Sequence, residues 1–210
     1  MNDAIVAWPL LMKNRTPQQL GQVRLIAGRW RGKKLTVLAE PGLRPTSDRW
    51  RETLFNWLAP QLPDAQVLDC FAGSGALGLE ALSRGANHIC LLEHNPNVVQ
   101  QLQQTLQQLA VSSQQAIIYC VDAQQYLAQT AERRFTLVFL DPPFHQAMLP
   151  SLITLLEQHH WLTEEAWIYL ETEIDWQPTT IPTHWQLHRE KLSNQVAYRL
   201  YQRMPQLEYA

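Results

Sequence analysis

The residues with the clearest chemical potential are Asp141-Pro142-Pro143-Phe144, which follow the apolar segment 135–140. Two consecutive prolines fix the backbone and remove two N–H donors, so we expect the carbonyl oxygen of Pro142 to face outward beside the Asp141 carboxylate. Two adjacent acceptors suit an amine with two hydrogens, and the ring of Phe144 offers a flat face on which a base can stack. Although a plain Pro-Pro turn is the alternative, the tetrapeptide predicts a pocket for a flipped nucleobase that carries an exocyclic amino group.

A second candidate site is the stretch 67–78, where a short apolar run ends at Asp69 and glycines follow at 73, 75 and 78. Strand, glycine turn and helix in this order are typical of a nucleotide-binding crevice in a parallel sheet. The glycines let a ligand approach the main chain closely, and the N–H groups of the new helix point toward it. The spacing fits a dinucleotide as well as S-adenosylmethionine, and a turn that binds nothing is the third possibility. We interpret Gly78 as a residue that packs the helix.

Acidic residues end four consecutive predicted strands, at Asp69, Glu93, Asp122 and Asp141. Because the carboxyl ends of parallel strands meet at one edge of an open sheet, we expect all four at the ligand-binding edge. Glu93 is placed to accept hydrogen bonds from both ribose hydroxyls of an adenosine. Asp122 is placed to accept one from the adenine amine or to cap the next helix, and the two roles are compatible.

The elements that must position these residues alternate between strand and helix. From residue 67 onward, apolar strands are expected at 67–69, 88–92, 116–121, 135–140 and 166–170, the last ending at Glu171. Helices are expected at 96–109, 124–129 and 149–158, and the segments 185–191 and 196–202 form an antiparallel hairpin. Strands joined by helices in this way predict an α/β fold with a mainly parallel sheet.

A basic hairpin precedes this domain. Two strands, 23–27 and 35–38, flank a glycine-bounded loop with four cations and one aromatic ring: Arg29, Trp30, Arg31, Lys33 and Lys34. Lys and Arg bind phosphates and Trp can stack on a base, so the loop predicts contact with nucleic acid rather than a merely solvated surface.

A helix capped by Thr46 or Ser47 and running to residue 58 follows the hairpin. Trp50, Leu54, Trp57 and Leu58 form its apolar stripe, whereas Arg49, Glu52 and Asn56 share a polar face. That polar face either positions the target nucleotide or is simply solvated, with Arg49 and Glu52 forming an ion pair.

Composition narrows the class of protein. The 210 residues are 46% hydrophobic and carry three cysteines, Cys70, Cys90 and Cys120, in no metal-binding spacing, which predicts buried free thiols in a cytoplasmic protein without a metal. Residues 13–51 carry ten Lys/Arg and two acids, a net +8, whereas the remainder carries −10, which indicates a local site for a polyanion. Residues 4–12 make a poor signal peptide, and no apolar run is long enough for a membrane span. We expect a mobile tail at 1–21, an RNA-binding extension at 22–58 and a catalytic domain at 59–210.

In addition to these interpretations, the chain closely resembles one family, the bacterial 16S ribosomal RNA small subunit methyltransferase D family. Its members methylate guanine at N2. The supporting residues are Arg24-x-Ile26-x-Gly28-x-Trp30-Arg31-Gly32 and the stretches 43–58, 68–85, 139–144, 188–191 and 195–198. The resemblance covers about residues 22–203 and includes the basic hairpin, which methyltransferases at large lack. It implies a Rossmann-like fold with a seven-stranded, mainly parallel sheet and S-adenosylmethionine as cofactor.

The resemblance also implies roles for particular residues. The catalytic residues would be Asp141, Pro142 and Phe144. The cofactor would contact Asp69, Phe71, Gly73, Ser74, Gly75, Glu93, His94, Asp122 and Ala123. The RNA would contact Arg29, Trp30, Arg31, Lys33, Lys34, Arg44, Arg49, Arg51 and Asn56. The expected partner is 16S ribosomal RNA, within an assembled or assembling small ribosomal subunit, and we expect the protein to be a monomer.

Three other functions compete with this interpretation. The residues 141–144 would also serve methylation of adenine N6 or of a glutamine side chain, although the +8 segment disfavours glutamine and the lack of a large recognition insertion disfavours DNA. A NAD-linked oxidoreductase fits the glycine spacing but leaves 141–144 without a role. An RNA-binding factor that retains the cofactor without turnover is the non-enzymatic alternative.

Overall fold

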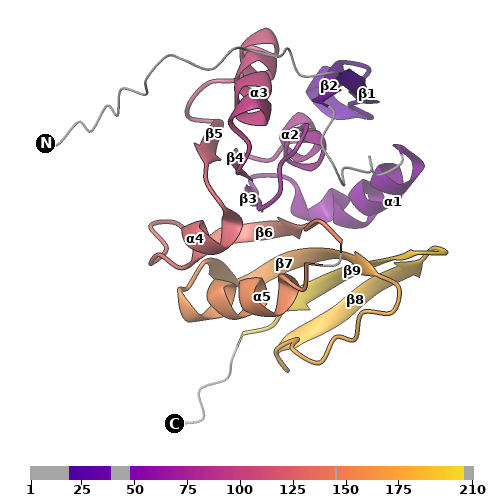
Figure 1. Ribbon diagram of the computed structural model, residues 1–210, viewed down its shortest axis with the longest axis vertical. Helices are drawn as coiled ribbons and strands as arrows, with labels where there is room; N and C mark the ends of the chain where they lie inside the picture. The colour runs from indigo at the N-terminus through magenta and orange to yellow at the C-terminus, as the bar shows by residue number, and fades with distance from the viewer. Residues whose placement is uncertain (1–18, 39–47, 145, 206–210) are drawn as a thin grey trace, which may run out of the picture.

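The computed structural model describes residues 19–38, 48–144 and 146–205. Its main body is a seven-stranded sheet in the order β5-β4-β3-β6-β7-β9-β8, and β1 and β2 form a separate antiparallel pair (Figure 1). The expected N-terminal cap at Thr46 or Ser47 and the expected RNA contact at Arg44 lie outside the described residues.

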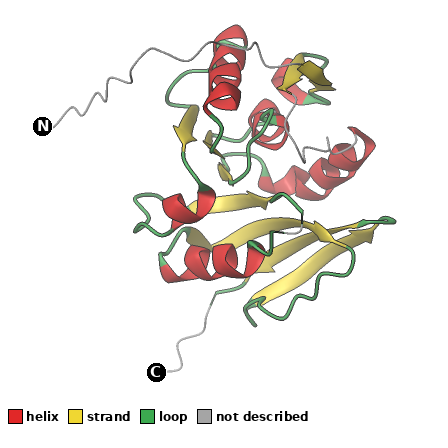
Figure 2. Cartoon of the chain, in the orientation of Figure 1, coloured by secondary structure: helices red, strands yellow, loops and turns green. Residues whose placement is uncertain are grey.

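Helices and strands alternate through the main body (Figure 2). The strands are β1 (Gln19–Arg24), β2 (Lys34–Leu38), β3 (Gln66–Asp69), β4 (His88–Glu93), β5 (Ala116–Cys120), β6 (Phe135–Leu140), β7 (Leu162–Glu173), β8 (Trp185–Leu192) and β9 (Val196–Arg203). The helices are α1 (Asp48–Leu58), α2 (Ala76–Ser83), α3 (Pro96–Gln108), α4 (Ala123–Leu127) and α5 (Leu149–Gln158), with short 3-10 turns η1 (Gly28–Trp30) and η2 (Ala59–Gln61).

The sheet has the topology expected from the sequence, with two differences. Strands β5, β4, β3, β6 and β7 are parallel, and β9 and β8 add the antiparallel hairpin, so the α/β prediction is confirmed. Strand β7 is longer than the segment 166–170, because Leu162 already pairs with Phe135 of β6 and residues 171–173 continue the pairing with β9. Strand β1 begins at Gln19, inside the segment expected to be a tail, because its pairing with β2 extends further than the sequence pattern indicates.

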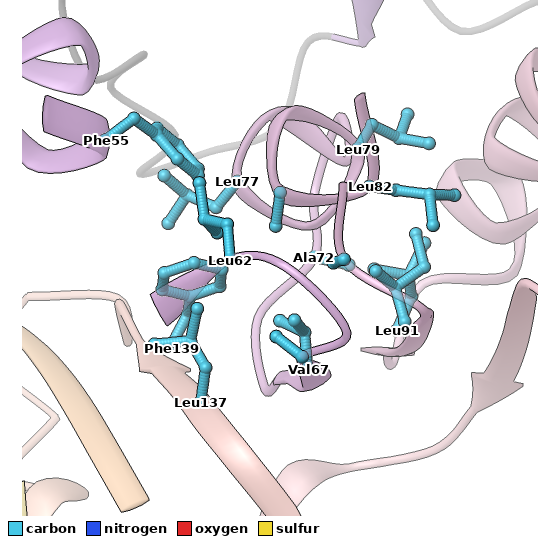
Figure 3. Close-up of a cluster of buried hydrophobic side chains, with 14 of the residues drawn as sticks. Phe55, Leu62, Val67, Ala72, Leu77, Leu79, Leu82, Leu91, Leu137 and Phe139 are labelled. Carbon is cyan, nitrogen blue, oxygen red and sulfur yellow. The ribbon is translucent and has the colours of Figure 1, made fainter. Parts of the chain in front are cut away.

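Two hydrophobic layers cover the two faces of the sheet. The apolar sides of α1, α2 and α3 pack in one cluster with alternate residues of the central strands, including Val67, Leu137 and Phe139. Figure 3 labels these three side chains together with other members of the cluster, among them Phe55 of α1 and Leu79 of α2. Helices α4 and α5 pack on the opposite face, against the other residues of the same strands. The face that a side chain occupies therefore follows from its phase on the strand.

The N-terminal extension is part of the first hydrophobic layer. Leu25 and Leu35 of the hairpin segment and Leu54 and Leu58 of α1 belong to the same cluster as the sheet residues. Residues of β1, β2 and α1 are thus fixed against the seven-stranded sheet by burial of apolar surface.

Two further findings concern the cysteines and the search for a helix that could cross a membrane. Cys70 and Cys90 are buried free thiols as expected, but the same prediction for Cys120 is wrong because Cys120 is exposed on β5, the edge strand. Within the described ranges, no helix combines the length and the apolar character needed to cross a bilayer.

Candidate active site

The predicted acidic residues gather along the edge of the sheet where the parallel strands end. Asp69 and Glu93 are the last residues of β3 and β4, Asp141 follows β6 directly, and Asp122 lies two residues beyond β5. Because β3 pairs with both β4 and β6, and β4 with β5, the four acids follow neighbouring strands. The expected arrangement of acids at one edge is confirmed.

The glycine turn is built from residues in left-handed conformations. Gly73 and Gly75 have φ angles of +50° and +77°, which side chains with a Cβ rarely adopt. At Gly75 a Cβ would also lie 2.8 Å from Leu102 and 2.9 Å from Leu79. The turn is closed by a hydrogen bond from Gly75 N to Ala72 O at 2.7 Å. Only glycine fits the turn at position 75, and the backbone of this turn is presented at the sheet edge.

Asp69, at the end of β3, is hydrogen-bonded to both the glycine turn and the helix that follows it. Its carboxylate accepts hydrogen bonds from Gly78 N at 3.1 Å and Phe71 N at 3.4 Å, and the side chain is buried. A Cβ on Gly78 would lie 2.5 Å from Leu91 and 3.3 Å from Asp69 Oδ2. The interpretation of Gly78 as a packing residue is confirmed, since it lets α2 approach the sheet.

Glu93 ties the turn to the neighbouring strand. Its Oε2 accepts a hydrogen bond from Gly73 N at 3.1 Å, and its Oε1 accepts one from Asn95 N at 2.8 Å. His94 Nδ1 lies 3.2 Å from Glu93 Oε1, with the imidazole exposed. Asp122 accepts hydrogen bonds from Gln124 N and Gln125 N, so the expected helix-capping role is confirmed. Contacts of Phe71, Ser74, Glu93, His94, Asp122 and Ala123 with a cofactor stay predictions.

The residues 141–144 form the next part of this edge. Asp69 pairs with Phe139, two residues before Asp141, so the glycine turn and the tetrapeptide belong to adjacent strands. Pro142 is buried, Pro143 is exposed, and Asp141 and Phe144 are half-buried. A candidate acceptor site therefore lies one strand away from the candidate cofactor site.

Glu171 joins the site although the sequence analysis assigned it no role. Leu140 pairs with Leu170 in the parallel β6–β7 ladder, which places Glu171 beside Asp141. Glu171 is 6% exposed, and its Oε2 accepts a hydrogen bond from the Tyr169 hydroxyl at 3.0 Å. Tyr169 in turn accepts one from Trp50 Nε1 of α1 at 3.0 Å. The signal was available, because Glu171 was the acid expected at the end of the fifth strand.

Burial and, to a smaller extent, neighbouring acids raise the pKa values of Asp141 and Asp69. Burial, then the charges of Glu171 and Asp69, hold the pKa of Asp141 well above its usual range. Burial also raises the pKa of Asp69 to about 7, against the effect of the N–H donors from Gly78 and Phe71. Within the described parts of the chain, no Lys or Arg forms an ion pair with Asp141 or Asp69. Asp141 and Asp69 therefore stand without a neutralising cation among the described residues.

The extension presents cations, with two corrections to the predicted RNA-binding residues. The exposed members of the set are Arg29, Arg31, Lys33, Lys34, Arg49 and Asn56. Trp30 is only 6% exposed and packs in the core, so its predicted stacking on a base is wrong. Arg51 is 1% exposed, and it donates hydrogen bonds to Arg24 O at 2.8 Å and Asp48 Oδ1 at 2.7 Å. Because Arg51 is turned inward, its predicted RNA contact is wrong as well.

Helix α2 anchors the basic hairpin. Glu80 is fully buried and accepts hydrogen bonds from Ile26 N at 2.7 Å and Ala27 N at 3.0 Å. Ser83 Oγ accepts one from Trp30 N at 3.0 Å and donates one to Ala27 O at 2.6 Å. The loop that carries the cations is therefore fastened to α2, the helix that starts at the glycine turn.

Comparison with known proteins identifies the family. A family model described as "Conserved hypothetical protein 95" matches residues 23–202. Ribosomal RNA small subunit methyltransferase D of Escherichia coli K12 is 52% identical over 197 residues, covering 94% of this chain and 98% of that protein. The chain belongs to the ribosomal RNA small subunit methyltransferase D family.

Other members of the methyltransferase D family and their structures agree with this assignment. The Haemophilus influenzae protein of the same name is 48% identical, covering 91% of this chain and all of that protein. The solved structure of yhhF from Escherichia coli, described as a methyltransferase, is 53% identical with a TM-score of 0.80, covering 89% of this chain and all of that one. A porphyrin methyltransferase of Synechocystis PCC 6803, solved with bound SAM, shares the fold at 18% identity and a TM-score of 0.60, covering 74% and 78% of the two chains.

Proposed function

We propose that the protein transfers a methyl group from S-adenosylmethionine to the exocyclic N2 amine of a guanine in 16S ribosomal RNA. The observation that carries this proposal is the position of residues 141–144 next to the glycine turn. The two sites follow β6 and β3, which are paired in parallel, and paired strands lie about 4.8 Å apart. A donor and an acceptor bound at these two places are neighbours, as a direct transfer requires.

The residues at the glycine turn fit S-adenosylmethionine. The backbone of Gly73, Ser74 and Gly75 is presented at the edge, and the Glu93 carboxylate beside it suits the ribose hydroxyls. Asp122 retains acceptor capacity for the adenine amine beyond the two backbone N–H groups that it caps. When bound, the cofactor supplies an electrophilic methyl group on a positively charged sulfur.

Asp141, Pro142 and Phe144 act on the base. The lone pair of a guanine N2 amine is delocalised into the ring, so the amine is a poor nucleophile. Hydrogen bonds from the two N–H groups to the Asp141 carboxylate and the Pro142 carbonyl stabilise the positive charge that develops on nitrogen. Phe144 holds the plane of the base. These residues therefore orient the amine and favour the transition state.

The extension holds the RNA backbone. Arg29, Arg31, Lys33 and Lys34 are exposed on the hairpin, and Arg49 and Asn56 are exposed on α1. Phosphate contacts of this kind release counterions, so RNA affinity falls steeply with salt, whereas affinity for the cofactor hardly changes. A flat salt dependence of RNA binding would contradict this part of the proposal.

The natural substrate is 16S ribosomal RNA within an assembled or assembling small ribosomal subunit, and the enzyme acts as a cytoplasmic monomer. Methylation rates on naked RNA and on purified subunits test the first statement, and sedimentation at working concentration tests the monomer.

The decisive experiment measures the modified nucleoside. The purified protein is incubated with methyl-labelled S-adenosylmethionine and small-subunit RNA from cells that lack the enzyme, and the RNA is digested for mass spectrometry. We expect label in N2-methylguanosine, and Asp141→Ala should abolish the label while RNA binding persists. Label in N6-methyladenosine would favour the adenine alternative, and no label despite bound RNA and cofactor would favour a non-enzymatic factor.

A further inference from the structure

Asp141 and Glu171 lie at the same level on neighbouring strands. Strands β6 and β7 are parallel and Leu140 pairs with Leu170, so the two acids are the next residues along each strand. Side chains in equal phase on adjacent strands point to the same face of the sheet, about 4.8 Å apart at the backbone. Tyr169, two residues before Glu171, packs in the cluster on the α1 side. The two carboxyl groups are therefore neighbours on that side.

Two hydrogen bonds connect Trp50 of α1 to Glu171 through the Tyr169 hydroxyl. The indole N–H of Trp50 can only donate, and it donates to the Tyr169 hydroxyl oxygen at 3.0 Å. The Tyr169 hydroxyl is left to donate its own hydrogen to Glu171 Oε2, also at 3.0 Å. Burial and the nearby acids raise the pKa of Tyr169 well above its usual range, so the phenol keeps that hydrogen. Glu171 thus receives a bond that favours its charged form.

Asp141 has the opposite surroundings. Among the described residues, no hydrogen-bond donor serves Asp141 as Tyr169 serves Glu171, and both neighbouring strands bring an acid close to it. Among the described residues, the titratable groups that act on Asp141 are Glu171 on β7 and Asp69 on β3. Asp141 in turn acts on Tyr169 of β7, and the Trp50 ring that is bonded to Tyr169 contacts Tyr198 of β9 and Lys191 of β8. Of the two neighbouring carboxyl groups, Glu171 has a donor that stabilises its negative charge, whereas burial and the neighbouring acids raise the pKa of Asp141.

We propose that Glu171 is a positioning residue that makes Asp141 the proton acceptor of the methyl transfer, with Tyr169 and Trp50 keeping Glu171 charged. The inference rests on the proposed function, because it concerns the proton that the target amine loses. The amine nitrogen forms its bond to the methyl carbon while the carbon–sulfur bond breaks and sulfur keeps the electron pair. The nitrogen then gives one proton to the Asp141 carboxylate, which becomes neutral. A carboxylate with a high proton affinity is suited to this step.

This arrangement also links the acid pair to the extension. Trp50 belongs to α1, the helix whose other face carries the exposed Arg49 and Asn56, and its ring packs on Tyr198 with a centroid distance of 3.7 Å. The helix proposed to contact RNA therefore supplies the first donor of the chain that ends at Glu171.

A titration of the free enzyme tests the charge relation without any substrate. Carboxyl carbons of aspartate are labelled with carbon-13, and the Asp141 signal is assigned by its loss in Asp141→Asn. We expect Glu171→Gln to lower the Asp141 titration midpoint by about 1 pH unit or more, since a neighbouring negative charge is removed. Tyr169→Phe should also lower the Asp141 midpoint. Without the hydrogen bond from Tyr169, Glu171 binds the shared proton more readily than before. The matched control is Glu165→Gln, an exposed acid on the same strand, which should leave the midpoint in place. An unchanged midpoint in Glu171→Gln, or an equal shift in the control, overturns the proposal.

The pH dependence of methyl transfer tests the catalytic consequence. In Glu171→Gln the acidic limb of kcat/KM should move to lower pH with the Asp141 midpoint, and the plateau kcat should fall about tenfold as Asp141 becomes a weaker base. An unmoved limb overturns the role of Glu171 even when the protein methylates guanine as proposed. If no guanine is methylated but the midpoint shifts, the proposed function fails while the relation between the two acids stands.

Discussion

The catalytic edge and the α5 side of the sheet treat buried carboxylates in opposite ways. On α5, Glu157 accepts hydrogen bonds from Arg203 Nε at 2.9 Å and Nη2 at 3.0 Å, from Trp185 Nε1 at 2.6 Å and, at 3.0 Å, from His184 Nε2 when that nitrogen carries its hydrogen. Although burial alone would raise it, these donors lower the pKa of Glu157. At the catalytic edge, Asp141, Glu171 and Asp69 are gathered together, and the pKa values of Asp141 and Asp69 are raised.

The contrast distinguishes a carboxylate that stabilises the fold from a carboxylate that is suited to accept a proton. A carboxylate surrounded by donors holds elements together and is a poor base, whereas one that faces other acids has a high proton affinity. The fold uses the first arrangement to fasten the β8–β9 hairpin to α5. It uses the second at the edge where we propose that the target amine loses a proton.

The largest effect is expected from Asp141→Asn. Removing the reactive carboxylate should reduce methyl transfer by about 10³-fold while cofactor affinity stays near that of the wild type. Single-turnover rates and cofactor titration measure the two quantities. Asp175→Asn, an exposed acid in the loop after β7, is the control and should retain full activity. A loss of less than tenfold would place the reactive group elsewhere.

Asp69 should give the protein an unusual dependence of stability on pH. Its pKa is about 7 in the folded state and near the ordinary 3.8 when unfolded, so its contribution is complete below pH 4 and is lost as pH rises through 7. The loss is on the order of 4 kcal/mol, at 1.36 kcal/mol per pH unit. We expect the free energy of unfolding in urea, plotted against pH from 4 to 8, to have different slopes for the wild type and for Asp69→Asn. Parallel curves for the two proteins would contradict the prediction.

Glu157→Ala should destabilise the fold without affecting the chemistry. Four hydrogen bonds are lost and the Arg203 guanidinium is left half-buried, for which we expect about 3 kcal/mol in the free energy of unfolding. Because the folded pKa of Glu157 is lowered, its contribution is present above the unfolded pKa and is lost as pH falls, the reverse of Asp69. Glu132→Ala, at an exposed position, serves as the control. Lower activity per folded molecule would show that the α5 side also serves catalysis.

A smaller effect is expected from Glu80→Gln. Glu80 belongs to α2, and both of its carboxylate oxygens accept hydrogen bonds, as those of Glu157 do. The amide cannot accept from both Ile26 N and Ala27 N while keeping the ion pair with Arg84, so the hairpin should loosen by about 2 kcal/mol. Hydrogen exchange at Ile26 and Ala27 should become faster and RNA affinity should fall, with cofactor binding retained. Unchanged exchange would show that apolar packing alone holds the hairpin.

The sequence predicted the site where local pattern decides the structure. Apolar runs that end in an acid located Asp69, Glu93 and Asp141, because a parallel strand must end at the common edge. The glycine spacing located the turn because Gly73 and Gly75 need left-handed backbone conformations. These predictions depend on residues within a few positions of one another.

The failures concern contacts between distant segments. Arg51 and Trp30 are residue types that often bind RNA, but the Arg51 guanidinium donates to Arg24 O, 27 residues away, and the Trp30 ring is buried in the cluster that α1, α2 and the sheet form. The sequence indicated the position of Glu171 as the acid at the end of a strand, but not its surroundings. These depend on pairing with β6 and on Trp50, which donates to Tyr169 across 119 residues of the chain. Periodicity shows which side of an element is apolar, but not which charged group a neighbouring backbone will hold.

The order of β7, β9 and β8 has a consequence for biosynthesis. Strand β9 lies between the other two, although β8 precedes it in the chain. As the ribosome releases the polypeptide from its N-terminal end, β7 therefore keeps an unpaired edge after β8 has emerged, and this edge includes the apolar Ile168 and Leu170. Such an edge can pair with other nascent chains. We expect binding by a chaperone to be strongest in the interval between the synthesis of β7 and that of β9, and Tyr198 to arrive beside Glu171 as one of the last steps in assembling the site.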